Sequence, residues 1–490
     1  GYKMLQRATN MSSLPIRAIQ FGEGNFLRAF IDWMLDGFNR KGYFNGQVRL
    51  IQPIPGGDFI RDAINRQNGL YTLVLRGIDQ GNIIEDTRVI EVVKDCLNAY
   101  NDWSAVKNTF LLPEARFLFS NTTEAGIEYK PLPKPADDEC PQTYPAKLAA
   151  LTYARYQAGL PGMIFIPCEL INQNGSTLKQ YMLKYAADWN YDAGFAAWLE
   201  NDCRFYNTLV DRIVAGYPKT ESEAFKQKLG YKDDLLDCGE IFHFFVLETT
   251  PETLAELPFE KAGLNVCITD DLTPYRTRKV RFLNGAHTSN VLAAILGGLT
   301  EVEEMMNDPL FGEAVRRSIY DEIFPTVALP DGEKNFFADS IVERFLNPFA
   351  HHRLLSISLN SVSKFKVRVL PTLLDYHQMK GRLPELLTFS LAALLRFYRI
   401  DRNADGTATG CVDGKRYPVS DSPEVLDFFA AKKTLSAPDF VRAALGNAAF
   451  WGCDLNSVPQ LAESVAADLE AIEKSGVRAA LKTLLGKAEK

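Results

Sequence analysis

Three residues whose side chains suit proton transfer stand close together in the segment Thr273–His287. Thr273 followed by Pro274 is a good helix start, so we expect this segment to be helical. At 100° per residue, Lys279, His287 and Asn284 fall at about 0°, 80° and 140° around the helix, which lets all three face one site. Such a set suits the interconversion of an alcohol and a ketone.

The lysine is the candidate acid and base. Nearby cations or loss of solvent ease its deprotonation, so it can take a proton from an alcohol and return one to a ketone. Asn284 can donate a hydrogen bond to the developing alkoxide, and His287 can orient the substrate hydroxyl. From the residues alone, a basic helix face with an interior histidine remains an open alternative. The cations expected to crowd Lys279 are Arg276, Arg278 and Arg281.

A glycine turn near the N-terminus has the form of a dinucleotide-binding loop. Ile16–Phe21 predicts a strand, Gly22 and Gly24 lie in the turn, and an amphipathic stretch runs from Phe26 to Phe38. In such a turn, backbone N–H groups can approach a pyrophosphate at the positive end of a helix. A plain tight turn is the alternative, because the third glycine of the fingerprint is absent. The candidate cofactor-binding residues here are Phe21, Gly22, Gly24, Asn25 and Phe26.

Polar residues follow another predicted strand, Arg116–Ser120. The segment Ser120–Gly126 should lie at the carboxyl edge of the sheet, where α/β proteins bind ligands. Its candidate cofactor-binding residues are Ser120, Asn121 and Thr122, with a polar capping turn as the alternative. After the second strand, Gln52 occupies the place where an NAD enzyme usually carries a ribose-binding acid, and Asp58 lies further along. This feature therefore leaves the choice between NADH and NADPH open.

The order of patterns divides the chain in two. Up to residue 272, strands and helices alternate, including a buried strand at Gly162–Pro167 and a hairpin of Leu70–Ile78 with Asn82–Val93 inserted into the sheet. From residue 273 onward nearly everything has helical spacing, with a Gly-rich loop or small hairpin at Gly406–Tyr417. We predict an α/β domain over 1–272 and a mostly α-helical domain over 273–490. The clearest helical segments of the second half are 289–297, 311–323, 383–399 and 460–486.

The composition is that of a folded protein without an obvious nucleic-acid partner. The chain has 490 residues, of which 46% are hydrophobic and 11% aromatic. Its 54 Lys and Arg against 61 Asp and Glu give a net charge of −7, which repels phosphate backbones and anionic membranes. No apolar run reaches the roughly 18 residues of a membrane-spanning helix, and the N-terminal segment lacks a signal peptide's apolar stretch. These features favour a cytoplasmic protein.

The cysteines and histidines show no metal-site spacing. The eight cysteines form no C-x-x-C pair, and the five histidines form no H-E-x-x-H motif. We expect reduced, mostly packed thiols and no bound metal. A metal-dependent hydrolase or lyase is therefore disfavoured.

Together these motifs resemble the polyol-specific long-chain dehydrogenases, the mannitol dehydrogenase family, whose helix signature is a lysine, an asparagine five residues on and a histidine eight residues on. Lys279, Asn284 and His287 match it, and the resemblance runs from about residue 16 to the C-terminus. It implies a Rossmann-like N-terminal domain with a mostly α-helical C-terminal domain. It also implies metal-independent hydride transfer with NAD (NADH), with the three residues in the roles given above.

Four segments are similar to a branch of this family that reduces a keto sugar acid in hexuronate breakdown: Gln20–Phe30, Phe119–Gly126, Ile166–Ile171 and Phe282–His287. Lys364 matches a substrate-binding lysine of the family, but Ser356 replaces an arginine, and Arg276 replaces an acid three residues before Lys279. Arg276 and Lys364 together favour a negatively charged substrate. The third substrate-binding candidate is Asp211, in a segment, Leu209–Ile213, that we expect to be an apolar helix holding a structural ion pair with Arg212.

One part of the family's alkoxide site differs in this chain. Cys168-Glu169-Leu170 replaces Cys-Asp-Asn, so Asn284 acts with one amide fewer unless Asn172 or Asn174 takes the missing place. Two alternatives stay open. One is another uronate or polyol substrate, such as fructuronate or mannitol, and the other is a non-catalytic dinucleotide sensor. The sequence predicts a small-molecule sugar acid as ligand and a monomer or small homo-oligomer.

Overall fold

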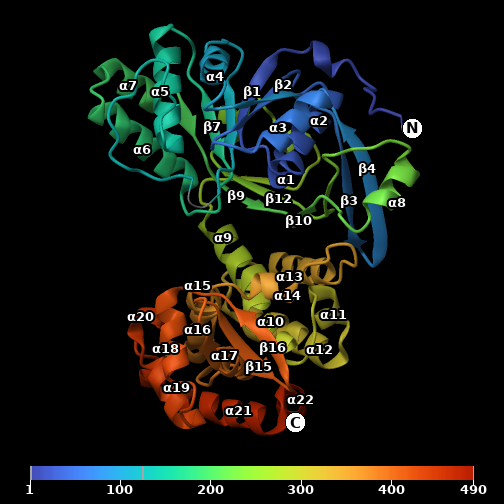
Figure 1. The fold of residues 1–490 in the computed structure, drawn as a ribbon, viewed down its shortest axis with the longest axis vertical. Helices are drawn as coiled ribbons and strands as arrows, with labels where there is room; N and C mark the ends of the chain where they lie inside the picture. Colours follow the sequence, from blue (N-terminus) through green and yellow to red (C-terminus); the bar gives the residue numbers. More distant parts are fainter. Residues whose placement is uncertain (1–2, 124–125, 489–490) are drawn as a thin grey trace. The chain divides into compact units, whose positions relative to one another are not determined.

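The structure is a computed structural model that describes residues 3–123 and 126–488. The chain divides into two compact units (Figure 1). The first comprises Gly1–Gly77 with Asn82–Leu272, and the second comprises Ile78–Gly81 with Thr273–Lys490. Glu124 and Ala125, which belong to the predicted segment Ser120–Gly126, lie outside the described residues.

The N-terminal unit is built on a six-stranded sheet with the order β5-β2-β1-β6-β7-β8. Every neighbouring pair in it is parallel. The chain builds one half outward from β1 and then reverses at β6, which is the order of a Rossmann fold. The predicted Rossmann-like α/β architecture is thus confirmed. The strands are β1 (Ile16–Phe21), β2 (Gln47–Gln52), β5 (Val93–Asn98), β6 (Phe117–Ser120), β7 (Ile164–Pro167) and β8 (Arg204–Phe205).

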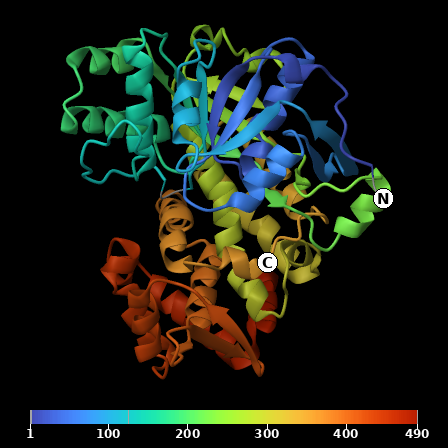
Figure 2. The same cartoon turned by 45° about the horizontal axis from the view of Figure 1, so that its top comes forward.

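Helices cover both faces of this sheet. On one face, alternate strand residues such as Ile19 and Leu118 pack with α4 (Trp103–Phe110), α5 (Tyr144–Gln157), α6 (Asn174–Asp188) and α7 (Ala193–Asn201). Figure 2 shows α5 to α7, teal to green, grouped on one side of the blue and cyan strands. On the other face the same strands pack with α2 (Ile31–Arg40). Burial on both faces explains the continuous apolar runs of the central strands.

Two smaller sheets complete this unit, and they correct two predictions. The predicted hairpin is present as β3 (Tyr71–Asp79) and β4 (Asn82–Ile90), but it belongs to a separate sheet of order β10-β11-β3-β4. Leu209–Ile213 is not helical, because residues up to Asp211 form β9, which pairs antiparallel with β12. A short apolar run fits a buried strand as well as a helix. The strands not yet bounded are β9 (Asn207–Asp211), β10 (Val214–Gly216), β11 (Asp237–Glu240), β12 (Phe244–Glu248) and β13 (Val266–Thr269).

The amphipathic stretch after the glycine turn is two helices rather than one. A four-residue α1 (Asn25–Arg28) ends before Phe30, whose backbone angles of φ −124° and ψ −80° are not helical, and α2 begins at Ile31. The remaining helices of the unit are α3 (Asp58–Arg66), α8 (Ser222–Leu229) and the 3₁₀ helices η1 (Met11–Ser13), η2 (Pro251–Leu254) and η3 (Phe259–Lys261).

The C-terminal unit is mostly helical, as predicted. Its central helix α17 is buried along nearly its whole length and packs against α10 and α21. Gly406–Tyr417 contains most of a hairpin of β15 and β16, to which β14 adds a third strand. The expected segment 460–486 is two helices, because Gly476 has a φ of +85° that ends the first.

The elements of this unit have the following bounds. Up to α13 they are α9 (Thr273–Lys279), the π-helix η4 (Val280–Asn284), α10 (Gly285–Leu296), α11 (Val302–Asn307), α12 (Pro309–Arg317), the π-helix η5 (Ser318–Ile323), η6 (Phe324–Thr326) and α13 (Asp331–Phe345). The next are α14 (Leu354–Ile357), α15 (Ser361–Arg368), α16 (Leu370–Lys380), α17 (Glu385–Phe397), β14 (Ile400–Arg402), β15 (Ala408–Val412) and β16 (Lys415–Val419). The last are α18 (Pro423–Ala431), α19 (Ala437–Leu445), α20 (Ala448–Trp451), η7 (Leu455–Ser457), α21 (Leu461–Ser475) and α22 (Val477–Ala488).

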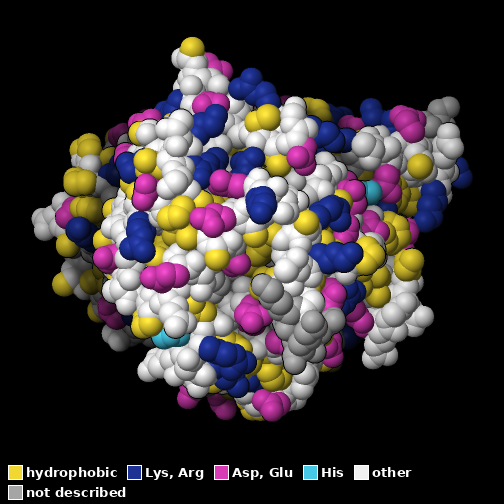
Figure 3. Space-filling view, turned by 90° about the horizontal axis from the view of Figure 1, so that it is seen from below, with side chains coloured by type: hydrophobic (Ala, Val, Ile, Leu, Met, Phe, Trp, Pro, Cys, Tyr) yellow, Lys and Arg dark blue, Asp and Glu magenta, His cyan; other side chains and the backbone are white. Residues whose placement is uncertain are grey.

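The described surface carries both signs of charge. On the face drawn in Figure 3, Lys and Arg side chains are interspersed with Asp and Glu among neutral and apolar residues. Among the described helices, none combines the length and apolar character needed to cross a membrane.

Candidate functional site

The two predicted cofactor segments meet at the carboxyl edge of the six-stranded sheet. Phe21, the last residue of β1, is in register with Ser120, the last residue of β6. The Asn121 N–H donates to the Phe21 carbonyl at 3.0 Å, and the Gly22 N–H donates to the Ile51 carbonyl at 2.9 Å. This is the point where the strand order reverses, which is the ligand-binding position of open α/β sheets.

The two glycines of the turn have different backbone roles. Gly22 has a φ of +123°, and a Cβ built on it would lie 2.8 Å from the Asn121 carbonyl oxygen, so only glycine fits. Gly24 has a φ of −69°, is exposed, and has no atom within 4 Å of an added Cβ. The turn is therefore packed at Gly22 and open at Gly24. Because α1 has only four residues, its dipole contributes less to anion binding than the predicted longer helix would.

Arg28, which the sequence analysis did not select, fixes the conformation of this turn. Its guanidinium is buried and donates to the Glu23 carbonyl at 3.0 Å, to Asn25 Oδ1 at 2.7 Å and to the Leu235 carbonyl at 2.9 Å. The Asn25 side chain is therefore used within the turn. The sequence signal for this role was an arginine that stands within an apolar stretch, between Leu27 and Ala29.

Below the turn, a buried amide and carboxyl pair supports Gly22. Gln20 Nε2 donates to the Gly22 carbonyl at 3.0 Å and to Asp32 Oδ2 at 3.1 Å. Burial raises the pKa of Asp32 to about 8, although the Gln20 hydrogen bond opposes the shift. A carboxyl group that stays protonated at neutral pH avoids placing an uncompensated charge beneath the turn.

Glu169 is a second residue that sequence reasoning did not assign to the site. It follows β7, is buried, and accepts hydrogen bonds from Ser120 Oγ at 2.9 Å and from the N–H and hydroxyl of Thr122 at 3.0 and 3.1 Å. Burial raises the pKa of its carboxyl group against these hydrogen bonds. The Ser120 and Thr122 hydroxyls thus point their hydrogens into the protein, and Asn121, whose side chain makes no hydrogen bond within the described residues, is the polar group of this segment available to a ligand.

Two acids lie near the end of β2, where a ribose-binding acid was sought. Gln52 Nε2 donates to Glu23 Oε1 at 3.3 Å, and burial raises the pKa of Glu23. Asp58 begins α3, and its carboxylate lies 3.3 Å from Arg61 at a largely exposed position. The glycine turn after β1 thus supplies one of these acids, Glu23.

In the C-terminal unit, the segment with Lys279, Asn284 and His287 is not a regular α-helix. Lys279 ends α9, Val280–Asn284 form a π-helical turn, and His287 lies in the first turn of α10. The wider π turn shifts Asn284 and His287 around the axis relative to Lys279, so the angles calculated for an ideal α-helix are wrong. Such turns occur frequently at functional sites.

The arginines expected to crowd Lys279 have other contacts. The Arg278 guanidinium lies 4.2 Å from the ring centre of Phe337. Arg281 forms an ion pair with Asp375 at 2.7 Å, which offsets its charge. Arg276 is half-buried, and burial lowers its pKa. The predicted crowding is thus weakened at Arg281, whose charge an acid offsets.

His287 and Asn284 have contrasting environments. Burial first, and then the charges of neighbouring basic groups, lower the pKa of His287 well below its usual value, so the imidazole is neutral. Its Nε2 is buried without a hydrogen-bond partner among the described side chains. Asn284 is half-buried, and its amide makes no hydrogen bond within the described residues. Both groups therefore retain hydrogen-bonding capacity for a ligand.

The remaining substrate candidates lie in both units. Lys364 is on α15, where its Nζ donates to the Ile357 carbonyl at 3.0 Å. Asp211 is buried at the end of β9 in the N-terminal unit. The neighbouring Arg212 donates to three backbone carbonyls, those of Ala29, Ile241 and Phe242.

The possible replacements for the missing alkoxide-site asparagine are also resolved. Leu170 is 54% exposed. Asn174 is buried, and its amide nitrogen donates to the carbonyls of Pro167 and Glu169 and to Thr208 Oγ1, at 3.0 to 3.2 Å. Asn174 therefore ties the end of β7 to β9 and is not available as an alkoxide donor, whereas Asn172 is exposed.

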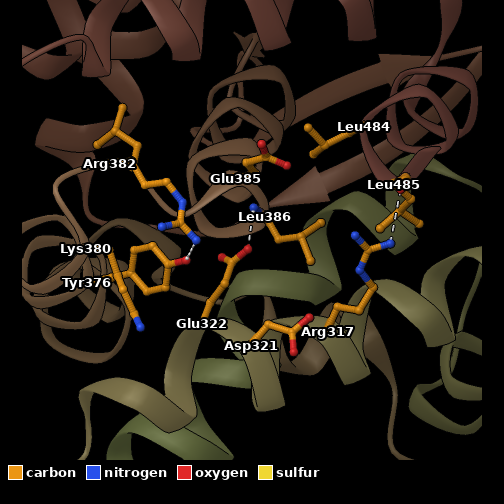
Figure 4. A pocket seen from close by; sticks show the side chains of 11 residues that line it. Arg317, Asp321, Glu322, Tyr376, Lys380, Arg382, Glu385, Leu386, Leu484 and Leu485 are labelled. Carbon is orange, nitrogen blue, oxygen red and sulfur yellow. Dashed lines mark hydrogen bonds between the residues drawn. The ribbon is translucent and has the colours of Figure 1, made fainter. Parts of the chain in front are cut away.

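A pocket of about 490 Å³ in the C-terminal unit has none of the predicted site residues in its walls (Figure 4). At its centre, Glu322 accepts hydrogen bonds from the N–H groups of Leu386 and Leu387, each at 2.9 Å, and so caps the start of α17. Burial raises the pKa of Glu322 to about 7. Three basic and three acidic side chains share the walls, so the pocket favours neither anions nor cations: Arg317, Lys380, Arg382, Asp321, Glu322 and Glu385.

Comparison with known proteins identifies the family. Residues 16–261 match the mannitol dehydrogenase Rossmann domain and residues 271–473 match the mannitol dehydrogenase C-terminal domain. Altronate oxidoreductase of Klebsiella pneumoniae (strain 342) is 44% identical over 96% of this chain and 97% of its own length. Altronate oxidoreductase of Yersinia enterocolitica serotype O:8 / biotype 1B is 42% identical with the same coverage.

Solved structures agree on the fold. The Pseudomonas fluorescens mannitol 2-dehydrogenase ternary complex with NAD and D-mannitol is 23% identical, with a TM-score of 0.75 over 98% of this chain and 96% of the other. A substrate-free D-sorbitol dehydrogenase is 22% identical, with a TM-score of 0.80 over 97% and 96%. The chain belongs to the mannitol dehydrogenase family and is an oxidoreductase that acts on CH–OH groups with a nicotinamide nucleotide as cofactor.

Proposed function

We propose that this protein is a tagaturonate reductase, also called altronate oxidoreductase, which reduces D-tagaturonate to D-altronate with NADH in a reversible, metal-independent reaction in the cytoplasm. The observation that carries the proposal is the similarity to proteins named altronate oxidoreductase, at 41 to 44% identity over nearly the whole chain. The half-buried Arg276 and the Lys364 amine provide the positive charge that a sugar acid requires and that mannitol does not.

In this proposal, residues 1–272 hold the cofactor and residues 273–490 bind the substrate. NADH, when bound, supplies the hydride that reduces the ketone carbon. The open turn at Gly24 receives the pyrophosphate, because there is space at this glycine and Arg28 fixes the backbone beside it. Phe21, Phe26 and the segment Ser120–Thr122 border the same sheet edge and complete the cofactor-binding set.

The helix with the π turn supplies the proton chemistry. Lys279 gives a proton to the ketone oxygen as the carbonyl carbon gains the hydride, and it takes that proton back in the reverse direction. The Asn284 amide donates to the same oxygen while negative charge develops on it. His287, neutral and with Nε2 unpartnered, orients a substrate hydroxyl. Asp211 on β9 completes the proposed set of substrate-binding residues.

Two other functions remain candidates. Fructuronate or mannitol would undergo the same chemistry, and mannitol fits less well because Arg276 replaces an acid. A non-catalytic NAD(H) sensor would need the glycine turn but gains nothing from Lys279, Asn284 and His287 together. No metal enters the proposal. Among the described residues, no group of three or more His, Cys, Asp or Glu side chains is suited to hold a metal ion.

The test is NADH oxidation with D-tagaturonate, D-fructuronate and D-fructose in parallel, repeated with NADPH and with a chelator. We expect rapid turnover of tagaturonate with NADH, unaffected by the chelator. Turnover of another ketose in its place would overturn the substrate assignment but keep the chemistry. NADH binding without turnover of any ketose would favour the sensor.

A further inference from the structure

Basic side chains surround His287, and the mechanism above uses only part of this group. Phe345 stacks on the His287 ring with centroids 4.3 Å apart and planes 11° apart, and His352 meets the ring edge to face at 5.3 Å. The imidazole is therefore fixed on its face and at its edge. A buried nitrogen left without a partner costs free energy, so Nε2 indicates a place where a ligand completes the hydrogen bonding.

Three basic residues on two helices act electrostatically on this ring. Arg344 is the neighbour of Phe345 at the end of α13 and is only 6% exposed. Lys364 and Arg368 lie one turn apart on α15, which packs against the start of α10. The contact is close, because a Cβ added to Gly285 would lie 2.9 Å from the Arg368 carbonyl oxygen.

The charges of these groups also affect the pKa values of the two histidines. After burial, the charges of His352, Arg344, Arg368 and Lys364 all lower the pKa of His287. Burial and Lys364 likewise lower the pKa of His352, so both rings tend to remain neutral. Like charges four residues apart on a helix, as on α15, repel each other. A concentration of positive charge beside an unpartnered nitrogen is complementary to an anion, and a guanidinium matches a carboxylate with two parallel hydrogen bonds.

We propose that Arg344, Arg368 and Lys364 bind the carboxylate of the sugar-acid substrate beside His287, and that the two arginines determine the preference for a sugar acid over a neutral ketose. This inference rests on the proposed function and deepens it. It adds Arg344 and Arg368 to the substrate-binding residues. It also assigns the main carboxylate contact to these residues instead of Arg276, which is on α9.

The test compares Arg344→Gln and Arg368→Gln with Lys366→Gln. Lys366 is a matched control, because it lies on α15 between Lys364 and Arg368 but is exposed. KM is measured for D-tagaturonate and for D-tagatose, which carries a hydroxymethyl group in place of the carboxylate, with the inhibition constant used where tagatose turns over slowly. We expect each arginine variant to raise KM for tagaturonate about 10- to 100-fold, as for loss of a hydrogen bond between charged groups. In the arginine variants, the KM or inhibition constant for tagatose should change less than about threefold. In the control Lys366→Gln, the constants for both sugars should change less than about threefold.

Equal losses on both sugars would assign the arginines a structural role and overturn the inference, as would an unchanged KM for tagaturonate. Arg344→Lys should recover part of the affinity, because it keeps the charge while losing the two-point geometry. If Arg344→Gln does not fold, the half-exposed Arg368 decides the question by its own variant. A wild-type protein that does not reduce tagaturonate refutes the proposed function itself, which separates that failure from the failure of the arginine assignment.

Discussion

The candidate cofactor edge of the N-terminal unit and the Lys279–His287 helix of the C-terminal unit position their groups by different means. At the sheet edge, strand register and backbone hydrogen bonds place Phe21, Gly22 and Asn121. In the helix, a π turn and the side chains packed around His287 place Lys279, Asn284 and His287. The first site therefore depends on main-chain shape, and the second on individual functional groups.

The two regions also bury opposite kinds of ionisable group. Beneath the glycine turn and the Ser120 segment, burial raises the pKa of the carboxyl groups of Asp32 and Glu169. Around the Lys279–His287 helix, burial lowers the pKa of His287 and His352. Burial thus favours the neutral form in both places, and around His287 the charges of basic groups act in the same direction as burial. This difference leads us to expect the C-terminal unit to determine the choice of substrate.

The largest effect should come from the C-terminal region, through Lys279→Ala. The variant removes the proposed acid and base, so kcat should fall by about 10²- to 10⁴-fold, the usual contribution of such a group. NADH affinity, measured by fluorescence titration, should stay within about threefold of wild type, because the proposed cofactor contacts lie in the other unit.

Lys366→Ala is the matched control for that experiment, since it removes an exposed lysine from the same unit. It should leave kcat and NADH affinity unchanged. Turnover by Lys279→Ala within tenfold of the wild-type rate would remove Lys279 from the mechanism and would leave the π turn as a structural feature.

The contrast between the regions also explains what the sequence predicted. The glycine turn, the buried strands and the polar segment after Phe119 each have local patterns, and a parallel sheet brings the ends of β1 and β6 together without further information. The fold class and the meeting of the two cofactor segments were therefore predictable. The signature of Lys279, Asn284 and His287 was equally local, and the family assignment is confirmed.

The parts that could not be predicted depend on contacts between residues distant in sequence. The π turn was not visible, because Val280–Asn284 has ordinary helical composition. Glu169 acquires its role only when β7 lies beside β6 and its carboxyl group reaches Ser120. Arg344 is one basic residue in an amphipathic helix until Phe345 stacks on His287. The strand β9 was missed because short apolar runs do not distinguish strand from helix.

At the sheet edge, the comparison is tested by Gly22→Ala against Gly24→Ala. Alanine at Gly22 would have to adopt a φ of +123° and approach the Asn121 carbonyl to 2.8 Å, so the turn must shift. We expect NADH affinity to fall about 10- to 100-fold and stability to fall by about 1–3 kcal/mol, as for strain at a special backbone position. Gly24→Ala has no comparable strain, and its thermal unfolding midpoint should stay close to wild type. Equal thermal stability of the two variants would contradict the view that main-chain shape defines this edge.

A smaller effect should distinguish the two acids near the end of β2. An acid that accepts hydrogen bonds from the adenosine ribose also repels the 2′-phosphate of NADPH. Asp58 is the better candidate, because its carboxylate is largely exposed whereas Gln52 holds that of Glu23. We compare kcat/KM for NADH with kcat/KM for NADPH. Asp58→Asn should lower the ratio of the first to the second by about 5- to 20-fold, which is close to the effect of losing one hydrogen bond to a charged group. Glu23→Gln should lower the same ratio by about twofold. The reverse order would place the ribose on the glycine turn itself, and no change in either ratio would mean that main-chain shape alone selects the cofactor at this edge.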